Sequence, residues 1–229
     1  MQRIVVTLVL FFLTAALPTT TLSAAESSVL DQIGEKISQY PVIRAEFIQT
    51  KQMQALKRPL ITTGQFTYAQ SDGVLWQITQ PYHISYVLGE DKIVEIDANG
   101  LRKERGLREV AGLAQVGRVF RAVLGANASA LHSYFDITVP NNSEQNDVGK
   151  WQLILKPKQQ QISKSLSMIT LSGSQFVETI VITEASGDST TLRFKNIQGF
   201  KKTQGVATLT ESELQLFGKP TIISKSAAP

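Results

Sequence analysis

The stretch "SDGVLWQITQP", Ser71 to Pro81, decides the predicted fold. It begins with a turn signal and ends at a proline, and apolar and polar residues alternate between them. Val74, Trp76 and Ile78 therefore fall on one side of an extended strand, and the residues between them fall on the other. A tryptophan in the middle of the apolar side either belongs to an ordinary closed core or lines a space that another molecule fills.

Similar strand patterns occur on both sides of this stretch. Short turns connect most of them, which predicts antiparallel pairing. A sheet of about ten strands must curl or close on itself. The predicted strands lie within residues 42–52, 61–70, 83–89, 92–100, 132–139, 150–157, 166–173, 176–185 and 189–198. A curled sheet has a concave face.

Two segments have helical periodicity instead. Residues Ser27–Tyr40 carry apolar side chains at three- and four-residue spacing, with a serine to cap the start and Pro41 to end the helix. Leu107–Ala126 shows the same spacing but contains Gly112 and Gly117, each of which costs a helix about 1 kcal/mol relative to alanine. These helices are the elements that can cover the concave face.

The N-terminal residues predict export. Arg3 precedes an apolar run, Ile4 to Leu17, that is too short for a stable membrane span, and small residues follow at positions 23–25. We expect residues 1–25 to be a signal peptide, although an uncleaved anchor is the alternative. Residues 26–229 then form a single domain whose tail after about residue 220 is loose. The absence of cysteine excludes a disulfide framework and fits a periplasmic protein.

The composition argues against catalysis. The chain has two histidines and no cysteine, so a Cys/His metal site is excluded by count. Nucleotide-binding and nucleophile-elbow motifs are absent, and no pair of carboxylates is fixed by spacing. We therefore expect a protein that is not an enzyme, with no cofactor, no metal and no catalytic residue.

The net charge is +4, too weak to predict a nucleic-acid partner. The basic residues in "LRKERGLREV", which begins at Leu101, precede the helical segment. We interpret them as a solvated turn. The alternative is a docking patch for an acidic partner or a lipid headgroup.

The run from Arg44 to Ile96 resembles the LolA family of periplasmic lipoprotein carriers. The matching features are Phe47 and Gln49, a glycine that opens the next strand at Gly64, and the run from Trp76 to Pro81. The segment "SMITLSGSQFVETIVITEASGDSTTLRFKNIQ" is similar to the closing strands of the family. None of these motifs is catalytic.

The resemblance implies a mainly β fold with helices. The fold of the family is an unclosed antiparallel β-barrel, which is a curled sheet whose apolar concave face is covered by helices and holds acyl chains. Carriers of this family have an arginine that helps to hold the helical lid, and the matching position here is Gln70. Control of the lid by that arginine therefore does not carry over, and we expect a divergent member.

Within this fold the alternating side chains predict a lipid-binding wall and a lid. The predicted cavity wall consists of Phe47, Phe66, Trp76, Ile78 and Tyr86, and the predicted underside of the lid consists of Val110, Leu113, Val116 and Phe120. Closed core is the alternative interpretation of both sets, and a register error of one residue would move a strand's side chains to the other face.

These expectations lead to one main functional hypothesis. The protein is predicted to bind the acyl chains of a lipoprotein or another lipid-linked cargo, as a monomer, and to deliver it toward the outer membrane between an inner-membrane donor complex and an outer-membrane acceptor. The first alternative is a lipid-sensing regulatory protein of the same fold, and the second is a closed interaction domain without a ligand. The sequence identifies neither the cargo nor the partners.

Overall fold

The computed structural model describes residues 22–89, 92–106, 122, 128–140, 149–201 and 209–219, with side chains described from residue 29 in the first helix. The strands are β1 (Val42–Gln52), β2 (Leu60–Ala69), β3 (Gly73–Gln80), β4 (Ile84–Leu88), β5 (Lys92–Asp97), β6 (Arg102–Gly106), β7 (Phe135–Thr138), β8 (Trp151–Pro157), β9 (Leu166–Gly173), β10 (Val177–Glu184) and β11 (Ser189–Phe200). The helices are α1 (Leu22–Ser38), α3 (Ala128–Tyr134), α4 (Gln160–Ser163) and α5 (Glu211–Phe217).

The eleven strands of the described residues form one antiparallel sheet in the order β6-β5-β4-β3-β2-β1-β11-β10-β9-β8-β7. The first six strands form one meander and the last five form another, and β1 pairs with β11 to join the two. Within the described residues, the strands at the ends, β6 and β7, do not pair with each other, so the sheet stays unclosed. This confirms the predicted fold class.

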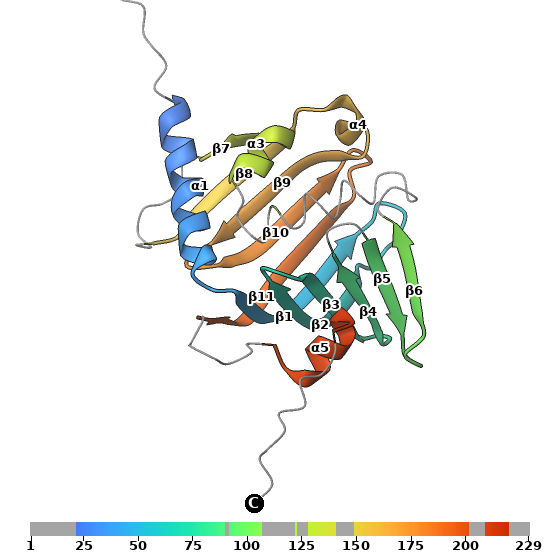
Figure 1. Cartoon of the computed structure of the whole chain (residues 1–229). Helices are drawn as coiled ribbons and strands as arrows, with labels where there is room; N and C mark the ends of the chain where they lie inside the picture. Colours follow the sequence, from blue (N-terminus) through green and yellow to red (C-terminus); the bar gives the residue numbers. More distant parts are fainter. Residues whose placement is uncertain are drawn as a thin grey trace, which may run out of the picture.

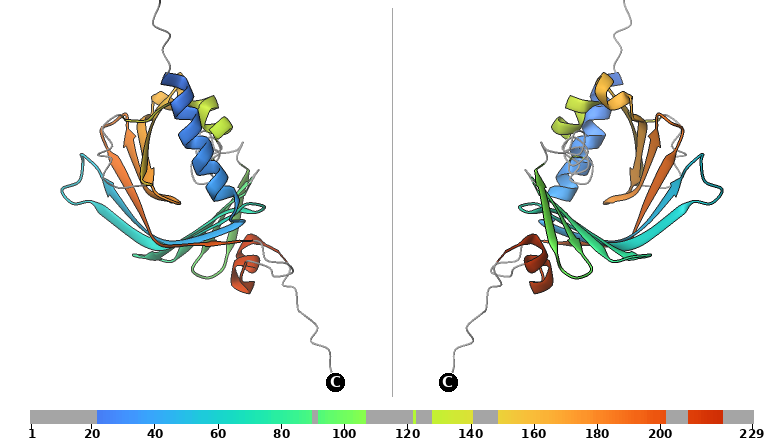
Figure 2. Two further views of the ribbon diagram at one scale, coloured as in Figure 1. Left: turned by 90° about the vertical axis from the view of Figure 1, so that its left-hand side faces the viewer. Right: turned by 90° about the vertical axis from the view of Figure 1, so that its right-hand side faces the viewer.

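The sheet curls around α1, which lies over its concave face together with α3 (Figures 1 and 2). Helix α5 lies on the opposite, convex side (Figure 2). The apolar stripe of α1 consists of Leu30, Ile33 and Ile37, each at most 3 % exposed, and it belongs to the same core cluster as the apolar side chains of the concave face. The main core therefore lies between α1 and the sheet.

A β-bulge in β11 changes which of its side chains face α1. The register shifts opposite Arg44 and Glu46, and Asn196 has a positive φ of 52°. The extra residue reverses the alternation, because successive strand side chains point to opposite faces. Phe194 and Ile197 therefore both join the concave cluster, although they are three residues apart.

The convex face carries a second, smaller apolar cluster beneath α5. Its buried members are Leu75, Val87, Val94 and Ile96, and Leu216 and Phe217 of α5 pack against them. The sheet is thus apolar on both faces where α5 covers it, which explains why β3 is buried almost along its whole length.

Glu213 fixes α5 to the convex face although its side chain is charged. It is 7 % exposed, and Arg44 holds both carboxylate oxygens, with Nε 2.6 Å from Oε1 and Nη2 2.5 Å from Oε2. The Thr67 hydroxyl donates to Oε1 at 2.9 Å. Glu213 also forms a capping box with Thr210, whose backbone N–H donates to Oε2 at 2.7 Å. One carboxylate therefore both starts α5 and joins it to β1 and β2.

These partners explain the acidity of Glu213. Burial alone would raise the pKa of its carboxyl group. The hydrogen bonds from Arg44, the Thr210 backbone and Thr67, together with the Arg44 charge, outweigh burial and lower the pKa from 4.5 to about 2. Because the folded-state pKa is lowered, the stabilisation is complete above about pH 4.5 and is lost as the pH falls toward 2.

We expect Glu213→Gln to reduce the free energy of unfolding by about 3 kcal/mol near pH 7, because the pKa difference corresponds to that amount. Urea unfolding at several pH values measures it. The gap between the native protein and the variant should close between pH 4.5 and pH 2. The exposed Glu211 of the same helix is the control, and Glu211→Gln should have little effect. A gap that is the same at both pH limits would contradict this account.

Four sequence expectations need correction. Helix α1 begins at Leu22 rather than Ser27, because Ala24 and Ala25 favour helix and the serines lie inside it. The basic segment after Leu101 is strand β6, paired with β5, rather than a turn. Its charged side chains are exposed at the edge of the sheet, which hides the alternation of a strand.

The other two corrections concern helices. His132 lies in α3, because the helix continues to Tyr134 and the strand begins at Phe135. Helix α5 was not predicted at all. Its signal is in the sequence nevertheless, because Thr210 and Glu213 have capping-box spacing and apolar residues follow.

Candidate lipid-binding face

Aromatic side chains from four adjacent strands meet on the concave face. Phe47 of β1 stacks on Trp76 of β3, with ring centroids 3.9 Å apart. Phe66 of β2 meets Trp76 edge-on at 6.0 Å, and Phe194 of β11 lies 5.2 Å from Phe66 and 6.3 Å from Trp76. We call Phe47, Phe66, Trp76 and Phe194 the aromatic wall. Each of them is at most 8 % exposed.

Gly64 makes the stacking of Phe47 on Trp76 possible. In the sheet it lies between Phe47 of β1 and Ile78 of β3. A Cβ atom at this position would lie 2.9 Å from the Phe47 ring and 1.8 Å from the Gln77 carbonyl oxygen. The Phe47 ring therefore lies over the glycine and reaches the indole beyond it.

The structure brings all five residues of the predicted cavity wall to one face. Ile78 is 9 % exposed and belongs to the same cluster as the aromatic wall, and Tyr86 packs against that cluster at its border. Burial raises the pKa of the Tyr86 hydroxyl, and its electrostatic interactions with Glu95 and Tyr82 raise it further. Their binding of lipid stays a prediction.

The predicted cavity wall did not include Phe194 or Ile197, which also lie on this face. Phe194 alternates with Leu192 in β11 and could have been found from that pattern. Ile197 could not, because it reaches the concave face only through the bulge at Asn196.

The C-terminal part of helix α1 packs close to the wall in this structure. Between them lies an apolar niche of about 20 Å³, roughly the size of one water molecule. Ile37 of α1, Phe66, Phe194 and Ile197 are among its lining residues. The four predicted lid residues, at positions 110, 113, 116 and 120, lie outside the described residues. Of the predicted insert, Ala122 is described, and it is helical and buried.

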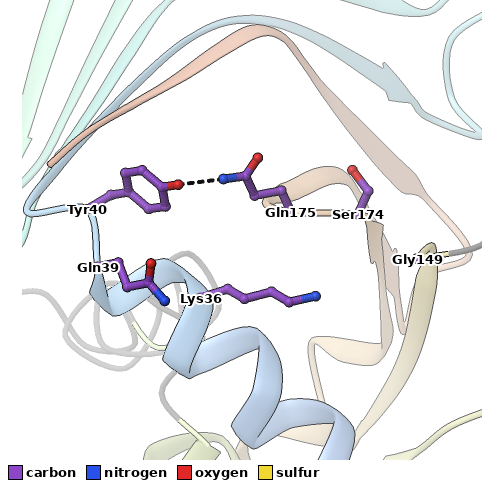
Figure 3. A pocket seen from close by; sticks show the side chains of 6 residues that line it. All are labelled: Lys36, Gln39, Tyr40, Gly149, Ser174 and Gln175. Atoms are coloured by element: carbon purple, nitrogen blue, oxygen red, sulfur yellow. Dashed lines mark hydrogen bonds between the residues drawn. The ribbon is translucent and has the colours of Figure 1, made fainter.

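A larger pocket of about 430 Å³, lined mainly by polar residues, opens where α1 ends (Figure 3). Lys36, Gln39 and Tyr40 line it from the α1 side, and Ser174 and Gln175 line it from the turn between β9 and β10. The Gln175 side-chain amide donates to the Tyr40 hydroxyl at 2.7 Å across this pocket. We call this the polar pocket. Sequence reasoning did not identify it, because its residues come together only through the pairing of distant strands.

The position that matches the lid arginine of the family is in the connection between β2 and β3. The Gln70 side chain is exposed, and its backbone N–H donates to the Pro41 carbonyl at 2.9 Å.

Within the described residues we found no cluster of His, Cys, Asp and Glu that could hold a metal ion. His83 lies just before β4, and His132 lies in α3. Across the same described residues, no helix combines the length and apolar character needed to cross a membrane.

The described strands and helices form an open, curled antiparallel sheet with an apolar concave face beneath a helix. The family model for LolA-like outer membrane lipoprotein carrier proteins matches residues 22–191 of this chain. The chain therefore belongs to the LolA-like family, and membership supports a role in binding lipid or lipoprotein. A comparison with curated proteins found no match.

Several solved structures are similar to this chain at low identity. An outer membrane lipoprotein-sorting protein domain from Vibrio parahaemolyticus has 10 % identity and a TM-score of 0.45, covering 81 % of this chain and 95 % of that one. The Mycobacterium tuberculosis lipoprotein LppX has 9 % identity and a TM-score of 0.44, covering 80 % and 99 %. The Pseudomonas aeruginosa MucA/MucB complex has 13 % identity and a TM-score of 0.44, covering 79 % and 59 %.

Proposed function

We propose that this protein is a periplasmic carrier that binds the acyl chains of a lipoprotein or another lipid-linked cargo and delivers it toward the outer membrane. The observation that carries the proposal is the aromatic wall beneath α1, in a chain of the LolA-like family. It acts by binding and not by catalysis. Residues 1–25 direct its export, and residues 26–229 form the carrier domain.

An acyl chain that takes the place of α1 must recover the free energy that burial of the α1 side chains contributes. The three buried stripe residues of α1, Leu30, Ile33 and Ile37, belong to the same core cluster as the wall, and Ile37 lines the niche beside Phe66 and Phe194. Burial of three such side chains contributes about 5–9 kcal/mol. An acyl chain contributes about 0.8 kcal/mol per buried methylene. A chain of roughly ten methylenes can therefore replace the stripe, and the closeness of the two sums allows release as well as capture.

Native mass spectrometry of the protein isolated from a periplasmic fraction tests the proposal. We expect a co-purifying acylated molecule, and we expect delipidated protein to take up a fluorescent fatty acid. Binding should rise steeply with chain length at about ten methylenes, because shorter chains cannot match the stripe of α1. Protein that is free of ligand and takes up no fatty acid of any length would contradict the proposal.

Transfer separates a carrier from a lipid sensor. Loaded protein is mixed with outer-membrane vesicles, and the labelled cargo is followed into the vesicles, with inner-membrane vesicles as the control. A carrier loses cargo preferentially to the outer-membrane fraction. Intact binding without any transfer would overturn delivery and leave the sensor.

A further inference from the structure

The polar pocket and the apolar niche are separated by two rings. Tyr40 follows α1, and Phe176 precedes β10, and their rings meet edge to face with centroids 5.2 Å apart. Tyr40 lines the polar pocket, whereas Phe176 lines the apolar niche together with Phe66 and Phe194. The two rings therefore lie between the polar pocket and the aromatic wall.

Gly199 of β11 lies directly beneath this pair of rings. A Cβ atom there would lie 2.5 Å from the Tyr40 ring and 2.8 Å from the Phe176 ring. Both rings therefore pack on the backbone of β11 at Gly199, and a side chain at this position would displace them. A chain that reached the niche from the polar pocket would have to part these two rings above Gly199.

The described side chains in and beside the polar pocket include two lysines. Lys36 lines the pocket, and the Lys201 ammonium lies 5.6 Å from the centre of the Tyr40 ring. One carboxylate is near, because the Ser174 hydroxyl donates to Glu178 at 2.5 Å. Among the described residues that line the pocket there is no carboxylate. Among these described groups there are two cations and one anion, a balance that favours an anionic ligand group in the polar pocket.

We propose that the polar pocket binds the anionic head of an amphiphile, a carboxylate or a phosphate, whose acyl chain passes between Tyr40 and Phe176 to the aromatic wall. This inference rests on the proposed function and specifies the class of its ligand. Lys36 and Lys201 attract the head, and the amides of Gln39 and Gln175 supply hydrogen bonds to it. The chain replaces the edge-to-face contact of the two rings.

Three ligands of equal chain length test the head pocket: a fatty acid, an alkyl phosphate and a fatty alcohol. We expect Lys36→Gln combined with Lys201→Gln to weaken both anionic ligands about 2- to 10-fold, the range for two exposed charge contacts, and to leave the alcohol unchanged. The anionic ligand that loses more affinity identifies the head group, a carboxylate or a phosphate. The loss should shrink at high salt.

Lys57→Gln is the matched control. Lys57 is exposed and follows β1, whose eleven residues extend about 30 Å away from Tyr40. One contrary result is that the native protein binds all three ligands while the double variant keeps the same relative affinities for them. That result would contradict binding of the anionic head in the polar pocket, but it would leave the proposed function intact. A native protein that binds none of them would overturn the proposed function as well.

Tyr40→Ala tests the passage through a different measurement. Removal of one ring should raise the association and dissociation rate constants of all three ligands at least several-fold, because the chain no longer has to part the two rings. The exposed Tyr82, in the connection between β3 and β4, supplies the control variant Tyr82→Ala. Stopped-flow fluorescence measures both rates, and rates equal to those of the native protein would overturn the passage.

Discussion

Replacing Trp76 by alanine is expected to lower the free energy of unfolding by about 3–5 kcal/mol. The indole is 8 % exposed and contacts three phenylalanine rings of the wall, so its removal leaves a cavity that rigid strands cannot close. Trp76→Phe should cost clearly less, because a ring can still stack on Phe47. Urea unfolding measures both, and a loss below about 1 kcal/mol for the alanine variant would contradict the packing described.

The neighbouring residue Leu75 provides a matched control for the location of that cavity. Leu75→Ala should also destabilise the protein by about 2–5 kcal/mol, but its cavity lies under α5 on the convex face. A saturating fatty acid should therefore raise the melting temperature of Trp76→Ala more than that of Leu75→Ala, because a ligand stabilises the state that binds it. Equal rescue of the two variants would contradict a ligand on the concave face.

Gly64→Ala is expected to lower the free energy of unfolding by about 3 kcal/mol or more, at the upper end of the cost of overpacking. The new methyl group would overlap the Gln77 carbonyl oxygen on the next strand, at 1.8 Å, and would press on the Phe47 ring. A backbone carbonyl cannot rotate away as a side chain can, so β2 and β3 must separate.

Gly89→Ala is the control for this substitution. A Cβ atom at Gly89 meets one atom, the Lys92 carbonyl oxygen, at 3.3 Å. Its cost should stay under about 1 kcal/mol. If Gly64→Ala were as mild as Gly89→Ala, the close approach of Phe47 to Trp76 over a bare backbone would be wrong.

The faces of the first strands could be predicted because a strand has a strict period of two residues. Val74, Trp76 and Ile78 lie on the concave face, and Leu75 lies on the other, as the alternation requires. The same rule fails in β11, where the bulge at Asn196 reverses the alternation. A bulge forms only when a strand pairs with its partner, so the sequence of one strand does not predict it.

The convex face was harder to predict than the concave face for a physical reason. Thr67 and Arg44 are polar and suggest a solvated surface, yet they bind the Glu213 carboxylate beneath α5. Their partner is more than 140 residues away along the chain. The polar pocket shows the same limit, because Tyr40 and Gln175 meet only after β1 pairs with β11 and β10 pairs with β9.

Tryptophan fluorescence tests the central claim that the cargo's acyl chain lies on the aromatic wall. The chain contains two tryptophans, so Trp151→Phe leaves Trp76 as the single reporter, and Trp76→Phe leaves Trp151. A saturating fatty acid brominated in mid-chain should quench Trp76 more strongly than Trp151, which lies at the border of the concave cluster beside Ser174 of the polar pocket, relative to the same fatty acid without bromine. Bound fatty acid that leaves Trp76 unquenched while it quenches Trp151 would contradict the account.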